Sequence, residues 1–419
     1  MTTTYIDPTA SNGGNGSLAH PFNSWGSLLP GSTAYLQKAG TTFNGVAYLD
    51  LKGSAGAPIT IGSYGAGAAP VIAGILDFDN GAQYITATGF GIISVNGPGI
   101  AIQNGANHIE VARMAISNSL AGIWMGNFAG SDNFIHDNTI QGSIGEGIGL
   151  DTTTAGAGHE TRVIHNTISR SGLDGIEVTT DHAIISGNTV SDSGLSHSGT
   201  AGIHLWGGDP ANGWGNDNFI SGNVLLHNHD ATFLDGEGIL LDRNVTGNVV
   251  SHNLTFGNDS AGIADYDNGG NTITGNTLIG DGVGPVAAHP VRTELWFAED
   301  NGQIEGNVIR DNVALSSAQG GFAVFTDAQS QVSGNSFSGN VYENTAGLVF
   351  DTNGTAGYGA QIDTWNTALG AQDLASGVLL NAPGTGGTDY TFAANTTRTI
   401  DGRSVHLVGW SAAKGLFGA

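Results

Sequence analysis

The chain has 419 residues, of which 36 are acidic and 11 are basic, giving a formal charge of −25 at neutral pH. A strongly negative surface repels nucleic acid and anionic membranes, so we exclude both as partners. The chain has no cysteine, which excludes a disulfide framework and thiol catalysis, and it has no apolar run long enough for a transmembrane helix.

Residues 1–75 are expected to form an N-terminal cap and the first strands. They contain an Asp/Gly-rich opening after Asp7, then Pro21-Phe22, then Pro30-Gly31-Ser32 before an apolar strand. This segment resembles the N-terminal part of bacterial β-helix proteins related to polysaccharide lyases. The resemblance implies a secreted protein with a polysaccharide as partner. The start lacks the charged and apolar regions of a signal peptide, so we expect export by another signal or a signal removed from this chain.

Residues 76–350 carry a repeat whose glycine recurs at positions 122, 147, 175, 202, 238 and 262, in steps of 25, 28, 27, 36 and 24 residues. One coil of three short strands fills such a step. Apolar residues alternate after each glycine, as in Ile176 and Val178 or Ile239 and Leu241, which is the period of a strand with one buried face. The repeat therefore predicts an all-β fold, a single-stranded right-handed parallel β-helix.

An asparagine also recurs once per coil, and this column predicts left-handed corner residues that stack as a side-chain ladder. We place in it Asn138, Asn166, Asn188, Asn223, Asn248, Asn276, Asn307 and Asn335. The pattern ends after Asp351, so residues 351–419 are expected to be a C-terminal capping tail, irregular at first and with a Thr-rich pair of strands from Thr388 to Trp410.

Polar and aromatic residues gather on one outward face of the coils, where two insertions, Gly207–Asn216 and His227–Asp235, interrupt the period. Long loops beside a stacked sheet often wall a binding groove. Aromatic rings can stack on the apolar faces of sugars, and polar groups can hold hydroxyls or a carboxylate. The expected substrate-binding residues are Trp206, Trp214, Phe233, Glu237 and Arg292; the plain alternative is a decorated surface without a ligand.

Four acidic residues fall on two neighbouring coils, namely Glu146, Asp151, Asp174 and Glu177. This density of oxygen ligands suits calcium, so we expect either a Ca²⁺ site or a solvated acidic surface here. No organic cofactor is expected, and the chain is expected to be a monomer.

The expected reaction is elimination at a uronic acid, as in a polysaccharide lyase. His204 beside Glu177 would be the base and Tyr266 the acid, and calcium or Arg243 would neutralise the uronate. The β-helix lyases commonly use a Lys or Arg base, and Lys occurs here only at positions 38, 52 and 414.

Three alternatives stay open. One is an inverting glycoside hydrolase with paired carboxyls from Asp174, Glu177, Glu237 and Asp242. The others are a uronate C5-epimerase and a non-catalytic adhesin.

Overall fold

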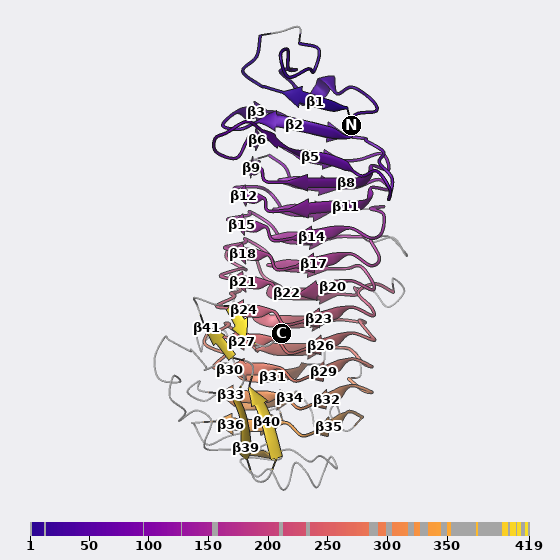
Figure 1. Ribbon diagram of the computed structural model, residues 1–419. Coiled ribbons are helices and arrows are strands. Elements are labelled where there is room, and N and C mark those ends of the chain that lie inside the picture. Colours follow the sequence, from indigo (N-terminus) through magenta and orange to yellow (C-terminus); the bar gives the residue numbers. More distant parts are fainter. Residues whose placement is uncertain are drawn as a thin grey trace. The chain divides into compact units, whose positions relative to one another are not determined.

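We analysed a computed structural model of the chain (Figure 1). The structure describes residues 2–11, 14–94, 96–126, 128–152, 158–208, 213–231, 235–284, 292–298, 304–316, 322–326, 334–344, 350–352, 374–375, 396–400, 403–407, 409–411 and 415–417. Internal contacts divide the chain into two units, which are described separately. The first is Met1–Gly172 with Ile176–Ile184, and the second is Leu173–Gly175 with Ile185–Ala419.

The first unit contains three parallel sheets whose strands follow one another around each coil. One sheet consists of β1 (Thr3–Ile6), β2 (Ala34–Lys38), β5 (Ile59–Tyr64), β8 (Gln83–Thr88), β11 (Asn107–Ala112), β14 (Phe134–His136) and β17 (Arg162–Ile164). Another consists of β4 (Ala47–Leu49), β7 (Leu76–Phe78), β10 (Ile100–Ile102), β13 (Ile123–Met125), β16 (Ile148–Leu150) and β19 (Ile176–Val178). The third consists of β3 (Thr42–Asn44), β6 (Val71–Ala73), β9 (Gly91–Ile93), β12 (Ala115–Ser117), β15 (Thr139–Gln141) and β18 (Thr167–Ser169).

The second unit repeats the pattern of three strands per coil. Its first sheet consists of β20 (Ile184–Ser186), which starts at the boundary, β23 (Phe219–Ser221), β26 (Val249–Ser251), β29 (Thr272–Thr274), β32 (Val308–Arg310) and β35 (Ser336–Ser338). Its second consists of β22 (Ala201–Trp206), β25 (Glu237–Asp242), β28 (Ile263–Tyr266), β31 (Thr293–Ala298), β34 (Phe322–Thr326) and β37 (Phe350–Thr352). Its third consists of β21 (Thr189–Ser191), β24 (Val224–Leu226), β27 (Leu254–Phe256), β30 (Thr277–Ile279), β33 (Val313–Ser316), β36 (Val341–Asn344) and β38 (Leu374–Ala375).

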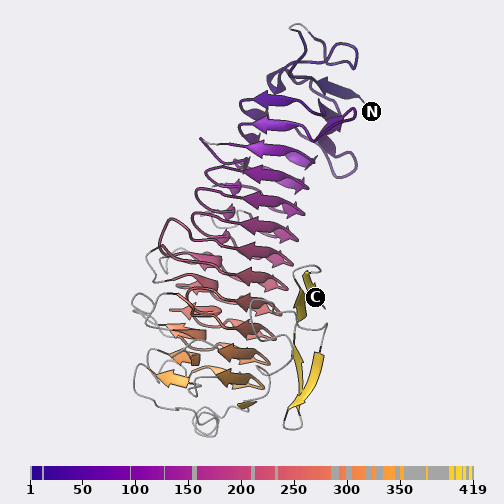
Figure 2. The ribbon, with the colours of Figure 1, turned by 90° about the vertical axis from the view of Figure 1, so that its left-hand side faces the viewer.

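The alternation seen in the sequence explains the core of each unit. In the second unit Ile203, Ile239 and Ile263 lie in register on successive strands and are fully buried. The next residue along each strand points to the opposite, outward face. The parallel strands of successive coils stack along each sheet, which is the arrangement of the predicted parallel β-helix (Figure 2). Among the described residues, the only helical element is the 3-10 turn η1 (Trp25–Ser27), and no helix there could span a membrane.

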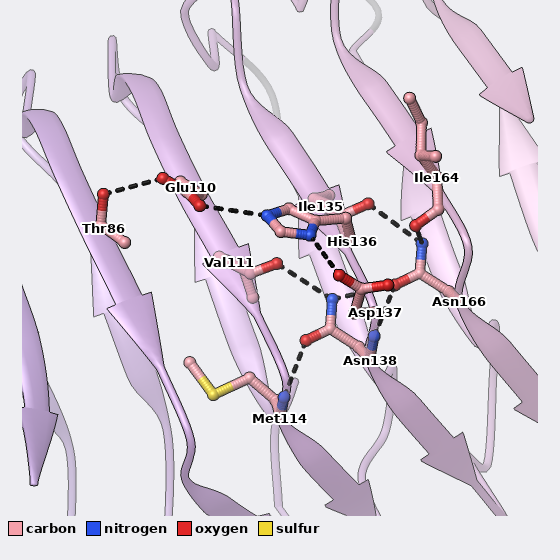
Figure 3. Close-up of polar contacts among 10 residues, drawn as sticks. All are labelled: Thr86, Glu110, Val111, Met114, Ile135, His136, Asp137, Asn138, Ile164 and Asn166. Atoms are coloured by element: carbon pink, nitrogen blue, oxygen red, sulfur yellow. Dashed lines mark hydrogen bonds and ion pairs between the residues drawn. The ribbon is translucent and has the colours of Figure 1, made fainter.

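Buried asparagines satisfy the backbone at the corners of the coils (Figure 3). Asn138 Nδ2 donates to Val111 O at 3.0 Å and to Asn166 Oδ1 at 2.9 Å, and its own Oδ1 accepts from Met114 N at 2.9 Å. Since a buried peptide group without a partner costs about 1–3 kcal/mol, the repeated Asn lets the chain turn a corner inside the protein without leaving such groups.

The asparagines form separate ladders, and the single column predicted from the sequence was wrong on this point. Asn223 bonds to Asn253, which continues to Asn276, whereas Asn248 bonds to Asn271 in another ladder. Each coil turns more than one corner, so two asparagines with similar sequence neighbours can belong to different corners.

The left-handed residue is also not the ladder Asn. It is the residue before it, for example Asp137 before Asn138 and His165 before Asn166.

The structure describes most of the predicted cap, residues 1–75, but only short segments of the predicted tail, residues 351–419. Strands β1, β2 and β5, within the predicted cap, already belong to a sheet of the coils. In the predicted tail, the antiparallel pairs β39 (Thr396–Ile400) with β40 (Arg403–Leu407) and β41 (Gly409–Ser411) with β42 (Gly415–Phe417) are formed. Most of the remaining tail lies outside the described residues.

Candidate functional site

The candidate site lies within the second unit, on the outward face of β22, β25, β28 and β31. Strand register places His204, Leu240, Ala264 and Trp296 in one outward column, and Trp206, Asp242, Tyr266 and Ala298 in the next. Neighbouring members of a column are about 4.8 Å apart, the spacing of paired strands. Residues far apart in the sequence therefore become neighbours on one surface.

His204 is held between two carboxylates and is 7% exposed. Its Nδ1 is 3.3 Å from Asp174 Oδ2, and its Nε2 is 3.4 Å from Asp242 Oδ2. Burial alone would lower the pKa of His204, but the charges and hydrogen bonds of Asp174 and Asp242 raise it well above 6.5. The surroundings of His204 therefore favour its protonated form, in which both ring nitrogens donate.

The partners of His204 differ from the predicted one. The sequence pointed to Glu177, which pairs in register with Gly149 in the first unit. In the structure the two ring nitrogens of His204 bond to Asp174 and Asp242. Asp174 is itself fixed, because its Oδ1 accepts a 2.6 Å hydrogen bond from the backbone N of Ala201.

A cavity of about 390 Å³ opens beside this histidine, within the size range of small-molecule sites. We call it the carboxyl cavity. Its lining residues are Gly199, Asp235, Glu237, Leu240, Asp242, Arg243, Ala264, Tyr266 and Trp296. The guanidinium of Arg243 lies 5.3 Å from the centre of the Tyr266 ring, and its Nε is 3.7 Å from Asp242 Oδ1. Asp242 thus forms ion pairs with two cations, His204 and Arg243.

Two other carboxyl groups of the cavity hold their protons more tightly than usual. Burial, followed by the charge of Asp230, raises the pKa of Asp235 to about 6. Burial and the charge of Asp235 raise the pKa of Glu237 well above 4.5. Neither carboxyl oxygen of Glu237 makes a hydrogen bond of normal geometry among the described residues, although the Ser260 hydroxyl is close enough to lower its pKa in part.

The structure brings together some of the predicted site residues. Glu237, Asp242, Arg243 and Tyr266 line the carboxyl cavity, and His204 bonds to Asp242 beside it. Trp206 is in register with Asp242 but is 37% exposed and does not line the cavity.

The other predicted binding residues are not brought to the cavity. Trp214 is half-buried and does not line it. Arg292 does not line it either, and its Nη2 donates to Gly284 O at 2.5 Å. Phe233 lies outside the described residues.

The four residues predicted for calcium fall in both units. Glu146, Asp151 and Glu177 belong to the first unit, and Asp174 belongs to the second. Asp151 Oδ2 accepts a 2.6 Å hydrogen bond from Trp124 Nε1. The Asp174 carboxylate is hydrogen-bonded to His204 and to the backbone N of Ala201. In the described part of the chain, no three His, Asp or Glu side chains form a group that could hold a metal ion.

Sequence reasoning missed Asp235 and Trp296. Asp235 ends the insertion His227–Asp235, so the irregular period pointed to the loop but not to this carboxyl. Trp296 comes after residues 285–291 in the sequence, where the glycine used to align the repeats has no equivalent. Its place in the column became visible only through the strand register.

Comparisons with known proteins agree on the fold. Residues 128–289 match the model of the right handed beta helix region. The chain is similar to a GH136 lacto-N-biosidase from Eubacterium ramulus, with 14% identity, 84% of this chain and 68% of that one covered, and a TM-score of 0.57. It is also similar to the PL6 family alginate lyase AlyGC, with 16% identity, coverage of 84% and 53%, and a TM-score of 0.53.

A third similar structure is the A-module of a mannuronan C-5 epimerase from Azotobacter vinelandii, with 14% identity, coverage of 83% and 90%, and a TM-score of 0.50. No curated protein is significantly similar to the chain in sequence. At these identities the likeness concerns the fold, and it confirms the predicted right-handed parallel β-helix.

Proposed function

We propose that the protein is a glycoside hydrolase that cleaves an uncharged glycan in the carboxyl cavity, with Asp235 as general acid and Asp242 as general base. One observation carries this proposal: the same cavity is lined by Asp235, whose burial favours its protonated form, and by Asp242, a carboxylate that pairs with His204 and Arg243. Such a pair is what hydrolysis of a glycosidic bond requires.

The chemistry follows from these two states. Asp235 is half-buried and keeps its proton up to about pH 6, so it can protonate the oxygen of the leaving sugar. Asp242 removes a proton from the water that attacks the anomeric carbon. The bond between that carbon and the leaving oxygen breaks as the new bond to water forms. Afterwards Asp235 regains a proton and Asp242 releases one, both through solvent.

His204 acts in this scheme through Asp242. Its Nδ1 bond to Asp174 fixes the ring, and its Nε2 bond holds the Asp242 carboxylate in one orientation. His204 is a positioning residue, because it does not line the cavity and both of its ring nitrogens are bonded to carboxylates.

Elimination at a uronate, the reaction expected from the sequence, is the second candidate. It is favoured by Arg243 and Tyr266, a cation and a phenol that lie together in the cavity. One observation weighs against it: both ring nitrogens of the expected base, His204, are bonded to carboxylates, which raise its pKa and favour its protonated form. The fold does not distinguish hydrolysis from elimination, since a lacto-N-biosidase, an alginate lyase and an epimerase share it.

The test is to incubate the full chain with a panel of neutral and acidic polysaccharides and to measure both new reducing ends and ultraviolet absorbance of unsaturated uronates. We expect reducing ends without unsaturated products, and loss of activity in Asp235→Asn and Asp242→Asn. Asp132→Asn, which changes an exposed carboxylate of the first unit, is the matched control and should keep full activity. Unsaturated products would establish the lyase instead. A parallel series with a chelator tests the calcium prediction.

A further inference from the structure

The insertion His227–Asp235 carries a second acidic residue, Asp230, which is buried. It is 1% exposed, and its Oδ2 accepts a 2.7 Å hydrogen bond from Gly199 N, in the turn of residues 197–201. Gly199 and Asp235 both line the carboxyl cavity, whereas Asp230 does not. The Asp230 side chain therefore connects the loop that ends at Asp235 to another part of the cavity wall, without lining the cavity itself.

Two backbone hydrogen bonds connect the same loop to the 197–201 turn. Ala231 N donates to His197 O at 3.0 Å, and Gly236 N donates to Thr200 O at 2.8 Å. In the sequence, one of these bonds comes before the general acid and the other directly after it. Since hydrogen bonds to a neighbouring segment limit the motion of a loop, the position of the general acid depends on this turn.

The end of the 197–201 turn is also connected to the general base. Ala201 N donates to Asp174 Oδ1 at 2.6 Å, and Asp174 Oδ2 lies 3.3 Å from His204 Nδ1. His204 in turn bonds to Asp242 through Nε2. One turn is thus connected to both carboxyl groups of the proposed reaction, to the acid through its loop and to the base through two side chains.

We infer that Asp230 is a positioning residue of the proposed hydrolysis: its side chain fixes the loop of Asp235 to the turn that also positions Asp242. This inference rests on the proposed function and adds a residue that does not line the cavity. The relative position matters because the distance between the two carboxyl groups decides whether a water molecule fits between the second carboxylate and the sugar. Loss of the Asp230 side chain changes that distance by releasing the loop.

The charge of Asp230 has a second effect on the general acid. Burial is the first cause that raises the pKa of Asp235 to about 6, and the charge of Asp230 is the second. Two carboxyl groups held close together resist carrying two negative charges, so a carboxylate at Asp230 helps Asp235 to keep its proton. In the described part of the chain, the other titratable or charged groups that act on Asp235 or share its cavity are His204, Asp242, Asp174, Glu237 and Arg243.

The experiment compares two substitutions of Asp230 in the full chain. Asp230→Asn keeps an acceptor for Gly199 N but removes the charge, whereas Asp230→Ala removes both. At pH values well below 6, Asp235 is protonated in both variants. There, kcat of Asp230→Ala should fall at least about tenfold, since a displacement of about 1 Å costs about a hundredfold. Asp230→Asn should recover most of that loss, and KM should change little in either variant.

The pH profile separates the charge from the hydrogen bond. Loss of the charge lowers the pKa of Asp235, so the alkaline decline of kcat/KM should begin at lower pH in Asp230→Asn than in the wild type. A residue that only kept the loop folded would not move this decline. The matched control is Asp259→Asn, which changes a buried carboxylate of the same unit that bonds to His229 and does not line the cavity. Its profile should match that of the wild type.

A measurement without substrate tests the same pair of residues. The folded chain keeps on Asp235 a proton that the unfolded chain releases, so this group lowers the stability as pH rises from 3.8 to about 6. Asp230→Asn should make that loss smaller. Its effect on a plot of melting temperature against pH should therefore be larger in the wild-type chain than in Asp235→Asn, where residue 235 does not titrate.

The outcomes distinguish this inference from the proposed function. Unchanged pH profiles, with equal effects of Asp230→Asn in the two chains, overturn the inference even if the wild type releases reducing ends. A wild type that releases none, but whose melting temperatures show the coupling between Asp230 and Asp235, overturns the hydrolase and supports the arrangement of the two carboxyl groups. If Asp230→Ala does not fold, the comparison of Asp230→Asn with the wild type decides.

Discussion

Replacing His204 by Gln tests the ion-pair arrangement that holds Asp242. In the folded protein His204 Nδ1 and Nε2 lie 3.3 Å and 3.4 Å from the carboxylates of Asp174 and Asp242. Gln has a similar polarity but no charge, so His204→Gln leaves the buried Asp174 and the half-buried Asp242 without the cation between them. Removing one partner of a buried ion pair costs about 3–5 kcal/mol, because the remaining charge is left uncompensated.

We expect the free energy of unfolding at pH 7 to fall by about 3 kcal/mol, the lower end of that range, since the side chain of Asp242 is still 19% exposed. Activity should fall about a hundredfold, because Asp242 loses its fixed orientation. Asp242 still pairs with Arg243 in this variant, so adding Asp174→Asn removes the buried charge that lost its cation and should restore part of the stability. The assays are urea unfolding followed by circular dichroism, and initial rates on the cleaved glycan.

The matched control is His229→Gln. His229 Nδ1 is 3.1 Å from Asp259 Oδ2, but the His229 side chain is 37% exposed, and ion pairs in contact with water contribute about 1 kcal/mol or less. The reasoning is refuted if His204→Gln destabilises the protein no more than this control, or if Asp174→Asn makes the His204→Gln protein less stable still.

Three further predictions follow from the same structure. The kcat/KM of the wild-type chain should decline above about pH 6, as Asp235 loses the proton it must donate; a profile flat to pH 8 would contradict its role as acid. Asp281 has its pKa raised by burial from 3.8 to about 6, so the folded chain holds a proton that the unfolded chain releases, and stability falls as pH rises from about 4 to about 6. The shift corresponds to about 3 kcal/mol, so Asp281→Asn should flatten a plot of melting temperature against pH, and an unchanged plot would argue against it. Asn253→Ala removes four ladder hydrogen bonds and should lower the unfolding free energy in urea by about 3 kcal/mol; a loss below about 1 kcal/mol would show that the ladder contributes little.

The fold could be predicted from the sequence because the residues that determine it recur once in every coil. A glycine followed by alternating apolar residues, as at Gly238, Ile239 and Leu241, fixes which face of each strand is buried. The ladders could not be separated in the same way. Asn223 and Asn248 follow similar sequences, Ile-Ser-Gly and Val-Thr-Gly, and only the ladder hydrogen bonds show that they occupy different corners.

The candidate site was harder to predict because it depends on the sequence between the repeats. Outward positions such as Asp242 and Tyr266 could be placed from the register of the repeats, and both line the cavity. The orientation of His204 could not, since its partner Asp174 comes from the turn before another strand. Asp235 ends a loop, where no period fixes the position of a side chain.

The reaction itself is tested most directly by cleaving the glycan in water enriched in heavy oxygen and weighing the products by mass spectrometry. Hydrolysis assisted by Asp242 places one solvent oxygen at the new reducing end, so we predict one heavy oxygen per bond cleaved, and none above background with Asp242→Asn. Products that are cleaved but carry no solvent oxygen would show that the bond is broken by elimination and would contradict the assignment of Asp235 and Asp242.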